Sequence, residues 1–378
     1  MEAKNNLWHC GQKIGRGFVV VGFALLLTAS CGGGSGNSTP PPPGMTAAAT
    51  PTFVTVAAQN GAQIVSLSDA TAGATIYYTL DGSTPTSSSP QYLAPILVAS
   101  SLTFKAIATH SGNSDSAVAS QTFSPGIAPG TLVWSDEFSN AAGSNAQPNS
   151  AVWTYDTGNS GFGNHELETY CAWDSTASPC DSNSPNAYVG NDGNLHVVAL
   201  HPANGVYTSA RLKSQGLFSF SYGRLEARMK LPEGQGLWPA FWTLGNNIAT
   251  INWPACGEQD VMEHINAPIP DWVAGSIHGT SLNGSQQINA PTGQTFGDWH
   301  IYGMTWSKGS VSYYLDTPTN VYATFTTSNT TGTWPFDSNA GAFIILNLAV
   351  GGDWPGVPDA TTPFPSEMLV DYVRIYAN

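Results

Sequence analysis

Positive charge is scarce in this sequence. Lysine and arginine together number 11, against 25 aspartate and glutamate residues, and the formal net charge is -14. Three of the cations, Lys4, Lys13 and Arg16, lie near the N-terminus, so the remainder of the chain is more acidic still. Proteins that bind nucleic acid present a basic patch to the phosphate backbone. The sequence has no such patch, so nucleic acid is not an expected partner.

Long hydrophobic runs are also missing. A membrane-spanning helix needs about 20 apolar residues, and the apolar run at 18–27 is too short. This run follows basic residues and closes on TASC at 28–31, which is the layout of a secretory signal peptide. Small residues before a cysteine resemble a bacterial lipoprotein cleavage site, although Thr28 stands where leucine is most typical. We expect a signal peptide at 1–30 and a lipid on Cys31, with ordinary signal cleavage as the alternative.

Both alternatives predict export. The protein would be lipid-anchored at the bacterial cell envelope or secreted, and the anchor would be its only link to a membrane. Residues 31–50 are rich in Gly, Ser and Pro and are predicted to form a flexible tether with a stiffer proline stretch.

Cysteine is sparse as well. Besides Cys10 and Cys31, the chain contains three cysteines, Cys171, Cys180 and Cys256. Export would place these three in an oxidising compartment. Cys171 and Cys180 bracket a short loop that a disulfide could close, which leaves Cys256 as a buried free thiol, although other pairings remain open. Neither a CxxC motif nor a His-rich cluster occurs, so a zinc site is not expected.

Short apolar segments separated by Gly, Asn, Asp and Pro fill the chain from 131 to 378, without helical periodicity. This pattern predicts an all-β fold, a β-sandwich. The clearest strands are expected at 195–200, 225–231, 311–315 and 368–376. The 12 tryptophans suit flat, hydroxyl-edged ligands such as sugars, although most aromatic side chains could equally be core.

Residues 51–124 form a second, smaller β unit, which a linker at 125–130 separates from the larger one. Strands are expected at 75–80 and 102–106. The stretch ATIYYTLDGSTPT, followed by SLTFKAIA and SAVASQTF, resembles the chitobiase C-terminal-like domain, a small β-sandwich appended to bacterial sugar hydrolases. We expect this domain to act as a spacer, with sugar binding through Tyr77, Tyr78 or Tyr92 as the alternative.

The chemistry concentrates in the segment GEQDVMEHI at 257–265. Side chains alternate along a strand, so Glu258 and Asp260 share a face, whereas Glu263 should lie on the opposite one. One extra residue in a β-bulge at Val261-Met262 returns Glu263 to their side. Crowded carboxyls raise the pKa of one of them while a neighbour stays ionised, which is the requirement of a glycosidase acid–nucleophile pair. In retaining enzymes these two carboxyl groups stand about 5–5.5 Å apart.

The segment EQDVME resembles the E-[hydrophobic]-D-x-M-E signature of glycoside hydrolase family 16, in the bulged form of laminarinases. Supporting matches run through 131–378: LVWSDEF, NHELETY, DGNLHVVAL, YTSARLKSQGLFSFSYGRLEARMKLPEGQGLWPAFWTLG, DWHIYGMTW, FIILNLAVGGDWPG and MLVDYVRIY. The resemblance implies a concanavalin-like jelly-roll sandwich with a concave cleft, in an enzyme that cuts polysaccharide internally with retention of configuration. It assigns Glu258 as nucleophile and Glu263 as acid/base, with Asp260 hydrogen-bonded to the nucleophile. No cofactor is expected for this chemistry.

One residue departs from the signature. Gln259 occupies the hydrophobic position that faces the sandwich interior, where a buried amide needs hydrogen-bond partners. Because the three acids are intact, we interpret Gln259 as a local packing variation and expect activity.

The resemblance also implies residues that line the cleft: Asn164, Glu166, Arg211, Trp238, Trp242, Trp253, His278 and Asn347. Trp253 would stack on a glucose ring, and His278 would contact the sugar or the acid/base. Alternatives stay open for the others: one of Trp238 and Trp242 could be core, and Glu166 could be a surface charge. His278 could be structural, and Asn347 otherwise needs a buried partner for its amide.

A structural calcium ion on the convex face is a further expectation from the family. Glu137, Gly193 and Asp371 match the segments that would hold it through carboxylate and carbonyl oxygens. The residue pattern itself does not demand an ion.

The sequence predicts a retaining endo-glycosidase that hydrolyses β-1,3-glucan or mixed-linkage β-1,3/1,4-glucan. Its expected binding partner is the polysaccharide substrate, and its expected oligomeric state is a monomer. Other activities on the same fold are alternatives: agarase, carrageenase or galactanase. A transglycosylase is disfavoured because its strand usually lacks the bulge. A non-catalytic glucan-binding protein is disfavoured because both glutamates are present.

Overall fold

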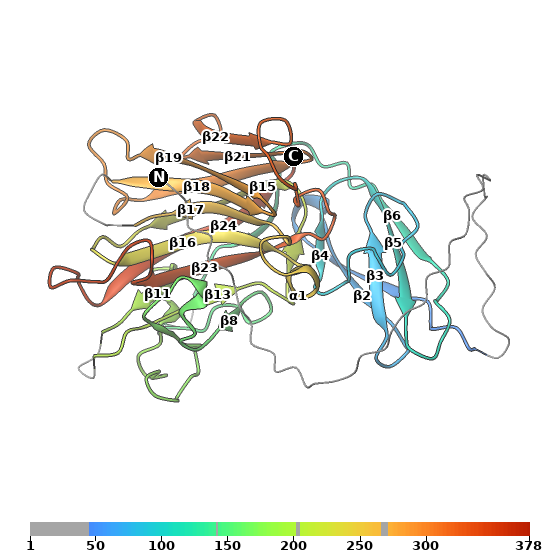
Figure 1. The fold of residues 1–378 in the computed structure, drawn as a ribbon, viewed down its shortest axis with the longest axis horizontal. Coiled ribbons are helices and arrows are strands. Elements are labelled where there is room, and N and C mark those ends of the chain that lie inside the picture. Colours follow the sequence, from blue (N-terminus) through green and yellow to red (C-terminus); the bar gives the residue numbers. More distant parts are fainter. Residues whose placement is uncertain (1–44, 141–142, 202–204, 266–270) are drawn as a thin grey trace, which may run out of the picture. The chain divides into compact units, whose positions relative to one another are not determined.

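Figure 1 shows the computed structural model of the chain, in which strands predominate. It describes residues 45–140, 143–201, 205–265 and 271–378. The expected signal peptide, Cys31 and most of the tether lie outside the described residues. Helical segments among the described residues are short: α1 (Ile248–Ile251), η1 (Gln59–Gly61) and η2 (Gly161–Gly163). None of them is long and apolar enough to cross a membrane.

The larger unit is a sandwich of two sheets, as the sequence predicted. Eleven strands of the described chain form the first sheet, in the order β1 (Thr52–Ala57), β2 (Gln63–Ser68), β4 (Ile96–Val98), β14 (Ser219–Phe220), β23 (Ala342–Val350), β16 (Leu237–Gly245), β17 (Glu258–Glu263), β18 (Trp272–Gly279) and β19 (Leu282–Asn289), with β13 (Arg211–Lys213) and β8 (Thr154–Asp156) branching beside β23. Figure 1 shows β23, β16, β17, β18 and β19 running side by side.

The second sheet of the described chain has eight strands: β10 (Ala187–Val189), β11 (Leu195–Ala199), β24 (Ser366–Tyr376), β15 (Gly223–Lys230), β20 (His300–Ser307), β21 (Ser310–Leu315) and β22 (Val321–Thr326) in order, with β7 (Leu132–Asp136) beside β24. All four strands expected in the larger unit are present, as β11, β15, β21 and β24. A two-stranded parallel ladder joins β9 (Thr169–Tyr170) to β12 (Thr208–Ser209).

Alternating side chains build the core between the two sheets. Phe241 and Met262 from the first sheet and Met304 and Val373 from the second are fully buried in one cluster. β23 differs, because all nine of its residues, AFIILNLAV, are buried. A strand covered on both faces has no solvent side to alternate toward. This central strand therefore carries Asn347 in an almost wholly apolar setting.

The smaller unit has its own core. β3 (Thr75–Thr79), β5 (Leu102–Thr109) and β6 (Ala119–Phe123) form a three-stranded sheet. Tyr78 and Phe104 from this sheet pack with Val65 and Ile96 from β2 and β4. The small β-sandwich predicted for 51–124 is therefore present, and Tyr78 is a core residue.

The two units share a sheet, which nothing in the sequence pattern indicated. β4 of the small unit pairs in parallel with β14 of the large one, at Ile96 opposite Ser219. The Ser219 N–H donates to the Pro95 carbonyl at 2.9 Å. The Tyr78 hydroxyl reaches the carbonyl oxygen of Ala340 at 2.9 Å, just before β23 begins. Backbone pairing of this kind joins the small unit to a sheet of the large one. The spacer role expected for the small unit stays a prediction.

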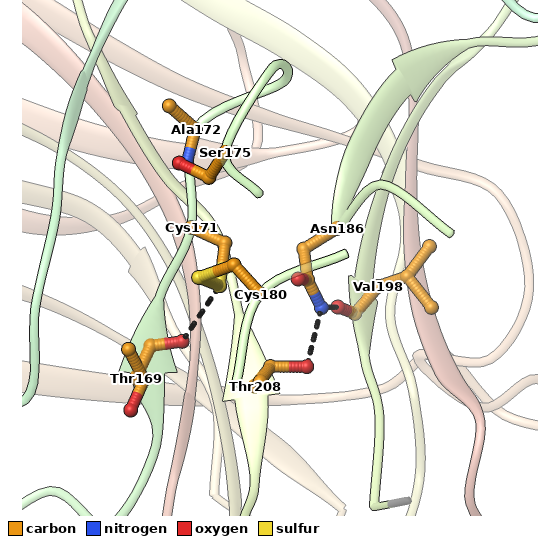
Figure 2. The surroundings of a disulfide bond; sticks show 8 residues. All are labelled: Thr169, Cys171, Ala172, Ser175, Cys180, Asn186, Val198 and Thr208. Atoms are coloured by element: carbon orange, nitrogen blue, oxygen red, sulfur yellow. Dashed lines mark hydrogen bonds between the residues drawn. A yellow bond between two sulfur atoms is a disulfide. The ribbon is translucent and has the colours of Figure 1, made fainter. Parts of the chain in front are cut away.

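Figure 2 shows the disulfide that joins Cys171 to Cys180, the pairing that their spacing favoured. Nearby, the Asn186 side-chain amide donates to the Val198 carbonyl at 2.8 Å and to the Thr208 hydroxyl at 3.1 Å (Figure 2). The loop is thus fixed beside β11 and β12. Cys256 is a buried free thiol, as expected.

The Tyr78 hydroxyl provides a test of the joined sheet. Tyr78→Phe removes the donor to the 340 carbonyl, and we expect a free energy of unfolding lower by about 1–2 kcal/mol, measured by urea unfolding. The control is Tyr77→Phe, which alters the next residue of β3, on its opposite face, and should change stability little. Equal losses in the two variants would contradict the role assigned to the Tyr78 hydroxyl.

Candidate active site

The predicted bulge lies in β17, where the sequence placed it. In the pairing with β16, Glu263 lies opposite Ala240 and Asp260 lies opposite Trp242. An advance of three residues along β17 therefore matches an advance of two along β16. The register against β18 shifts in the same interval, between Asp260 and Glu263. Glu258, Asp260 and Glu263 therefore share one face of the sheet, and the prediction is confirmed.

Two adjacent apolar side chains explain the position of the bulge. Val261 and Met262 are 1% and 0% exposed, so both are buried although they are consecutive in the strand. A regular strand sends neighbouring side chains to opposite faces. The extra residue accommodates both and lets Glu263 return to the cleft face.

Glu258 is held by donors from two other elements. The Trp253 indole N–H donates to Glu258 Oε2 at 3.1 Å, and His278 Nε2 lies 3.8 Å from Oε1. Burial and the charge of Asp260 raise the pKa of Glu258 to about 8, against the opposing charges of His278 and Arg211 and the Trp253 hydrogen bond. The cationic side chains of His278 and Arg211 keep this pKa lower than burial and Asp260 alone would set it, and so favour the ionised form that a nucleophile requires.

His278 connects the acids to β18. Its Nε2 atom lies 3.2 Å from Asp260 Oδ2, and its Nδ1 atom lies 2.8 Å from Asn283 Oδ1. Burial alone would lower the pKa of His278, but the contact with Asp260 and the charges of Asp260 and Glu258 outweigh it and raise that pKa to about 10. The imidazole is therefore protonated at neutral pH. It contacts the nucleophile side of the site, where the sequence had suggested the sugar or the acid/base.

Glu263 has the environment of a proton donor. Burial and the charges of Asp260 and Glu258 raise its pKa well above the ordinary value, although His278 and a hydrogen bond from Trp238 oppose the shift. The Trp238 indole N–H lies 3.2 Å from Glu263 Oε1. A carboxyl that keeps its proton at neutral pH can pass it to a leaving oxygen. Trp238 and Trp242 lie on the same face of β16, and both are half-buried.

The residues expected on the sugar-binding side form a hydrogen-bonded chain. Glu166, 8% exposed, accepts from the Asn164 amide at 3.2 Å and from the Tyr170 hydroxyl at 2.8 Å. The Asn347 amide donates to that hydroxyl at 3.2 Å, and its oxygen accepts from the Trp242 indole at 2.8 Å. Glu166 is thus not a surface charge, and Asn347 has the buried partner it needed.

Arg211 lies at the same side of the sheet. In register it faces Asn347 on β23 and Asp156 on β8, and its guanidinium pairs with Asp156 at 3.0 Å. The ring centroids of Trp242 and Phe162 lie 4.7 Å and 5.1 Å from its Cζ atom. This cation is one of the groups that lower the pKa of Glu258. All eight predicted cleft residues are therefore linked to the β17 acids or to this side of the sheet.

Sequence reasoning missed several aromatic neighbours. Trp354 is 40% exposed, and its ring lies 5.3 Å from that of Trp238 and 5.8 Å from that of Trp272. Tyr170, buried within the NHELETY motif, links Glu166 to Asn347. The quoted motifs contain Tyr170 and Trp354 but not Trp272, and a motif does not show contacts between distant segments.

Gln259 points into the core, as expected. It is 1% exposed and its oxygen accepts from the Thr243 hydroxyl at 3.0 Å. Its amide nitrogen is buried and has no hydrogen-bond partner among the described residues. Such a group costs about 1–3 kcal/mol of stability. Because this side chain lies on the face opposite the acids, its cost falls on stability and not on the chemistry.

Two groups of side chains carry atoms that could ligate a metal ion. Among the described residues, ligating side chains cluster only at Glu258, Asp260 and His278. His278 is protonated at neutral pH, so this set is better described as an ion pair than as a metal site. For the expected calcium, the carboxylates of Glu137 and Asp371 are each paired with an arginine, at 2.8 Å and 2.7 Å. A cation would have to displace these ion pairs or use backbone carbonyls, so the side chains as placed do not fit it.

Comparison with known proteins agrees with this geometry. Residues 174–374 match the glycosyl hydrolases family 16, and residues 56–120 match the chitobiase/beta-hexosaminidase C-terminal domain. The chain belongs to glycosyl hydrolase family 16, a family of enzymes.

Individual relatives support the same assignment. The chain is 38% identical over 265 residues to a beta-glucanase of Rhodothermus marinus, which covers 65% of this chain and 84% of that protein. The laminarinase catalytic domain of Thermotoga maritima superposes with a TM-score of 0.56 at 36% identity, covering 66% of this chain and 98% of that one. The endo-beta-1,3-glucanase of Pyrococcus furiosus gives 0.55 at 38% identity, with 65% and 94% covered.

The charge on His278 predicts a pH effect. His278→Gln keeps a polar contact for Asp260 but removes a cation that lowers the pKa of both glutamates. Both pKa values should rise, so ionisation of the nucleophile needs a higher pH. We expect the acid limb of kcat/KM against pH to move up by about 1 unit or more. His110→Gln, in the small unit, is the control and should leave the profile unchanged; an unmoved limb in His278→Gln would contradict the assigned electrostatics.

Proposed function

We propose that the chain is a retaining endo-glycosidase that hydrolyses β-1,3-glucan or mixed-linkage β-1,3/1,4-glucan. The observation that carries the proposal is the bulge in β17, which sets Glu258, Asp260 and Glu263 on one face. The names of the relatives, beta-glucanase, laminarinase and endo-beta-1,3-glucanase, support the choice of substrate.

The reaction would proceed by two displacements. Glu263 donates its proton to the glycosidic oxygen while the Glu258 carboxylate attacks the anomeric carbon, and the bond to the leaving sugar breaks. Glu263, now ionised, takes a proton from water, whose oxygen attacks the same carbon and releases Glu258. The Asp260 carboxylate and the protonated His278 remain paired beside Glu258 through both steps. Two inversions leave the configuration at that carbon unchanged.

Aromatic rings of the cleft would hold the polysaccharide. The Trp253 indole is hydrogen-bonded to the nucleophile and the Trp238 indole to the acid/base, so each ring lies at the cleavage point. Trp354 and Trp272 extend the aromatic surface on the Glu263 side. Flat rings of this kind offer apolar area and a polar edge to sugar rings.

Further proposals rest on the sequence and on the family resemblance. The signal at 1–30 and Cys31 support an exported, lipid-anchored or secreted protein, with 31–50 as tether. We propose residues 51–124 as the small domain, 125–130 as the linker and 131–378 as the catalytic domain. The proposed oligomeric state is a monomer. Calcium at Glu137, Gly193 and Asp371 rests on the family resemblance alone.

Substitution of the glutamates tests the mechanism. Glu263→Gln should lower kcat by about 10²–10⁴-fold through loss of the proton donor, and Glu258→Gln should abolish turnover through loss of the nucleophile. The assay is reducing-sugar release from laminarin, barley β-glucan, agarose and carrageenan. Glu233→Gln, an exposed carboxyl outside β17, is the matched control and should keep full activity.

The outcomes separate the candidates. Release from laminarin or barley β-glucan supports the proposal. Release from agarose or carrageenan alone would assign another activity of the family, and binding of laminarin without release would indicate a glucan-binding protein. Full activity in either glutamate variant would overturn the mechanism.

A further inference from the structure

Glu168 is a buried carboxyl group that the mechanism does not use. Its side chain is fully buried, and Oε2 accepts the backbone N–H of Val350 at 2.7 Å. Oε1 is buried as well, and no hydrogen-bond donor among the described residues reaches it. A buried carboxylate without donors for one oxygen is costly, whereas a carboxylic acid can use that oxygen as a hydroxyl donor.

The neighbour that would accept this hydrogen bond is Glu166. It is 8% exposed, and its two oxygens already accept from the Asn164 amide and the Tyr170 hydroxyl. Burial, the charge of Glu166 and a hydrogen bond to it raise the pKa of Glu168 well above the ordinary value. Two buried carboxylates side by side would repel, so one proton shared between them relieves the site.

The pair is connected to the cleft through hydrogen bonds with a fixed direction. Tyr170 donates to Glu166, so its hydroxyl oxygen is free to accept from the Asn347 amide. Asn347 then presents its oxygen to the Trp242 indole N–H. The Trp242 ring in turn lies against the Arg211 guanidinium. Each orientation depends on the one before it, beginning at the carboxyl pair.

We propose that Glu168 is a positioning residue: as an un-ionised acid it donates to Glu166 and, through Tyr170 and Asn347, fixes the Trp242 indole for sugar binding. The sugar-binding part of this statement rests on the proposed function. Glu168 itself does not touch the substrate.

The charges around Glu168 come from several elements. Glu166 and Tyr170 belong to its own segment. Arg211 of β13, which is paired with Asp156 of β8, acts on the neighbouring Tyr170. At the surface, His165 pairs with Asp353 at 2.9 Å. β23 contributes the Val350 N–H to the carboxyl itself. Loss of the Glu168 proton at high pH would thus add a second buried negative charge beside Glu166, and the hydrogen bond between them would disappear.

Glu168→Gln is the decisive variant. Glutamine keeps an acceptor for Val350 and a donor for Glu166, but it cannot ionise. Binding of a laminari-oligosaccharide is measured by calorimetry from mildly acidic to alkaline pH in two proteins, Glu258→Gln and Glu258→Gln/Glu168→Gln, neither of which turns over. Both should bind equally at acidic pH. At alkaline pH the first should lose about three- to ten-fold in affinity, the effect of one hydrogen bond, and the second should lose much less. Parallel curves would overturn the proposal.

A second measurement needs no ligand. The folded chain holds a proton on Glu168 that the unfolded chain releases above its pKa of about 4.3. Wild-type stability should therefore fall relative to Glu168→Gln as pH rises from that value through the folded-state pKa of Glu168. Melting temperatures of the two proteins across this range give the difference, and a constant difference would contradict the un-ionised acid. If the parent binds no laminari-oligosaccharide, the substrate proposal fails while this measurement still tests Glu168.

Discussion

The active site depends on one extra residue in β17. Val261 and Met262 both enter the core, and the strand bulges to admit them. Without the bulge, a strand with side chains of period two would turn Glu263 toward the interior and away from Glu258. The packing of two apolar side chains thus decides whether two glutamates can act on one bond. A constraint on the core becomes a constraint on the chemistry.

The same crowding would be unfavourable without compensating groups. Three acids share a partly desolvated face, and the structure offsets them unequally. Glu258 has protonated His278 at 3.8 Å and the Trp253 N–H at 3.1 Å, whereas Glu263 accepts the Trp238 N–H at 3.2 Å. Environment therefore separates two identical side chains into a nucleophile and an acid. The buried pair of Glu166 and Glu168 repeats the principle on the sugar-binding side, with a proton in place of a cation.

Sequence patterns predicted the features that repeat locally. Alternation identified the strands, and the odd spacing of Glu258 and Glu263 required a bulge. Contacts between distant segments were beyond reach: the link from Glu166 to Asn347 joins positions far apart in the chain and passes through Tyr170. The pairing of β4 with β14 could not be predicted from the sequence either. A short strand of sequence ILV is equally compatible with the free edge of a sheet and with a position inside a shared one. Local periodicity can be predicted from the sequence, whereas the register between distant strands depends on how they pack.

The central claim is that Glu258 and Glu263 act together in two displacements at one carbon. Proton NMR of a β-linked glucan during the first moments of digestion tests it most directly, because it shows which anomer of the new reducing end appears before mutarotation. The account predicts the β-anomer first, with the α-anomer growing later. Initial appearance of the α-anomer would mean a single inversion, and would contradict the assignment of Glu258 as nucleophile.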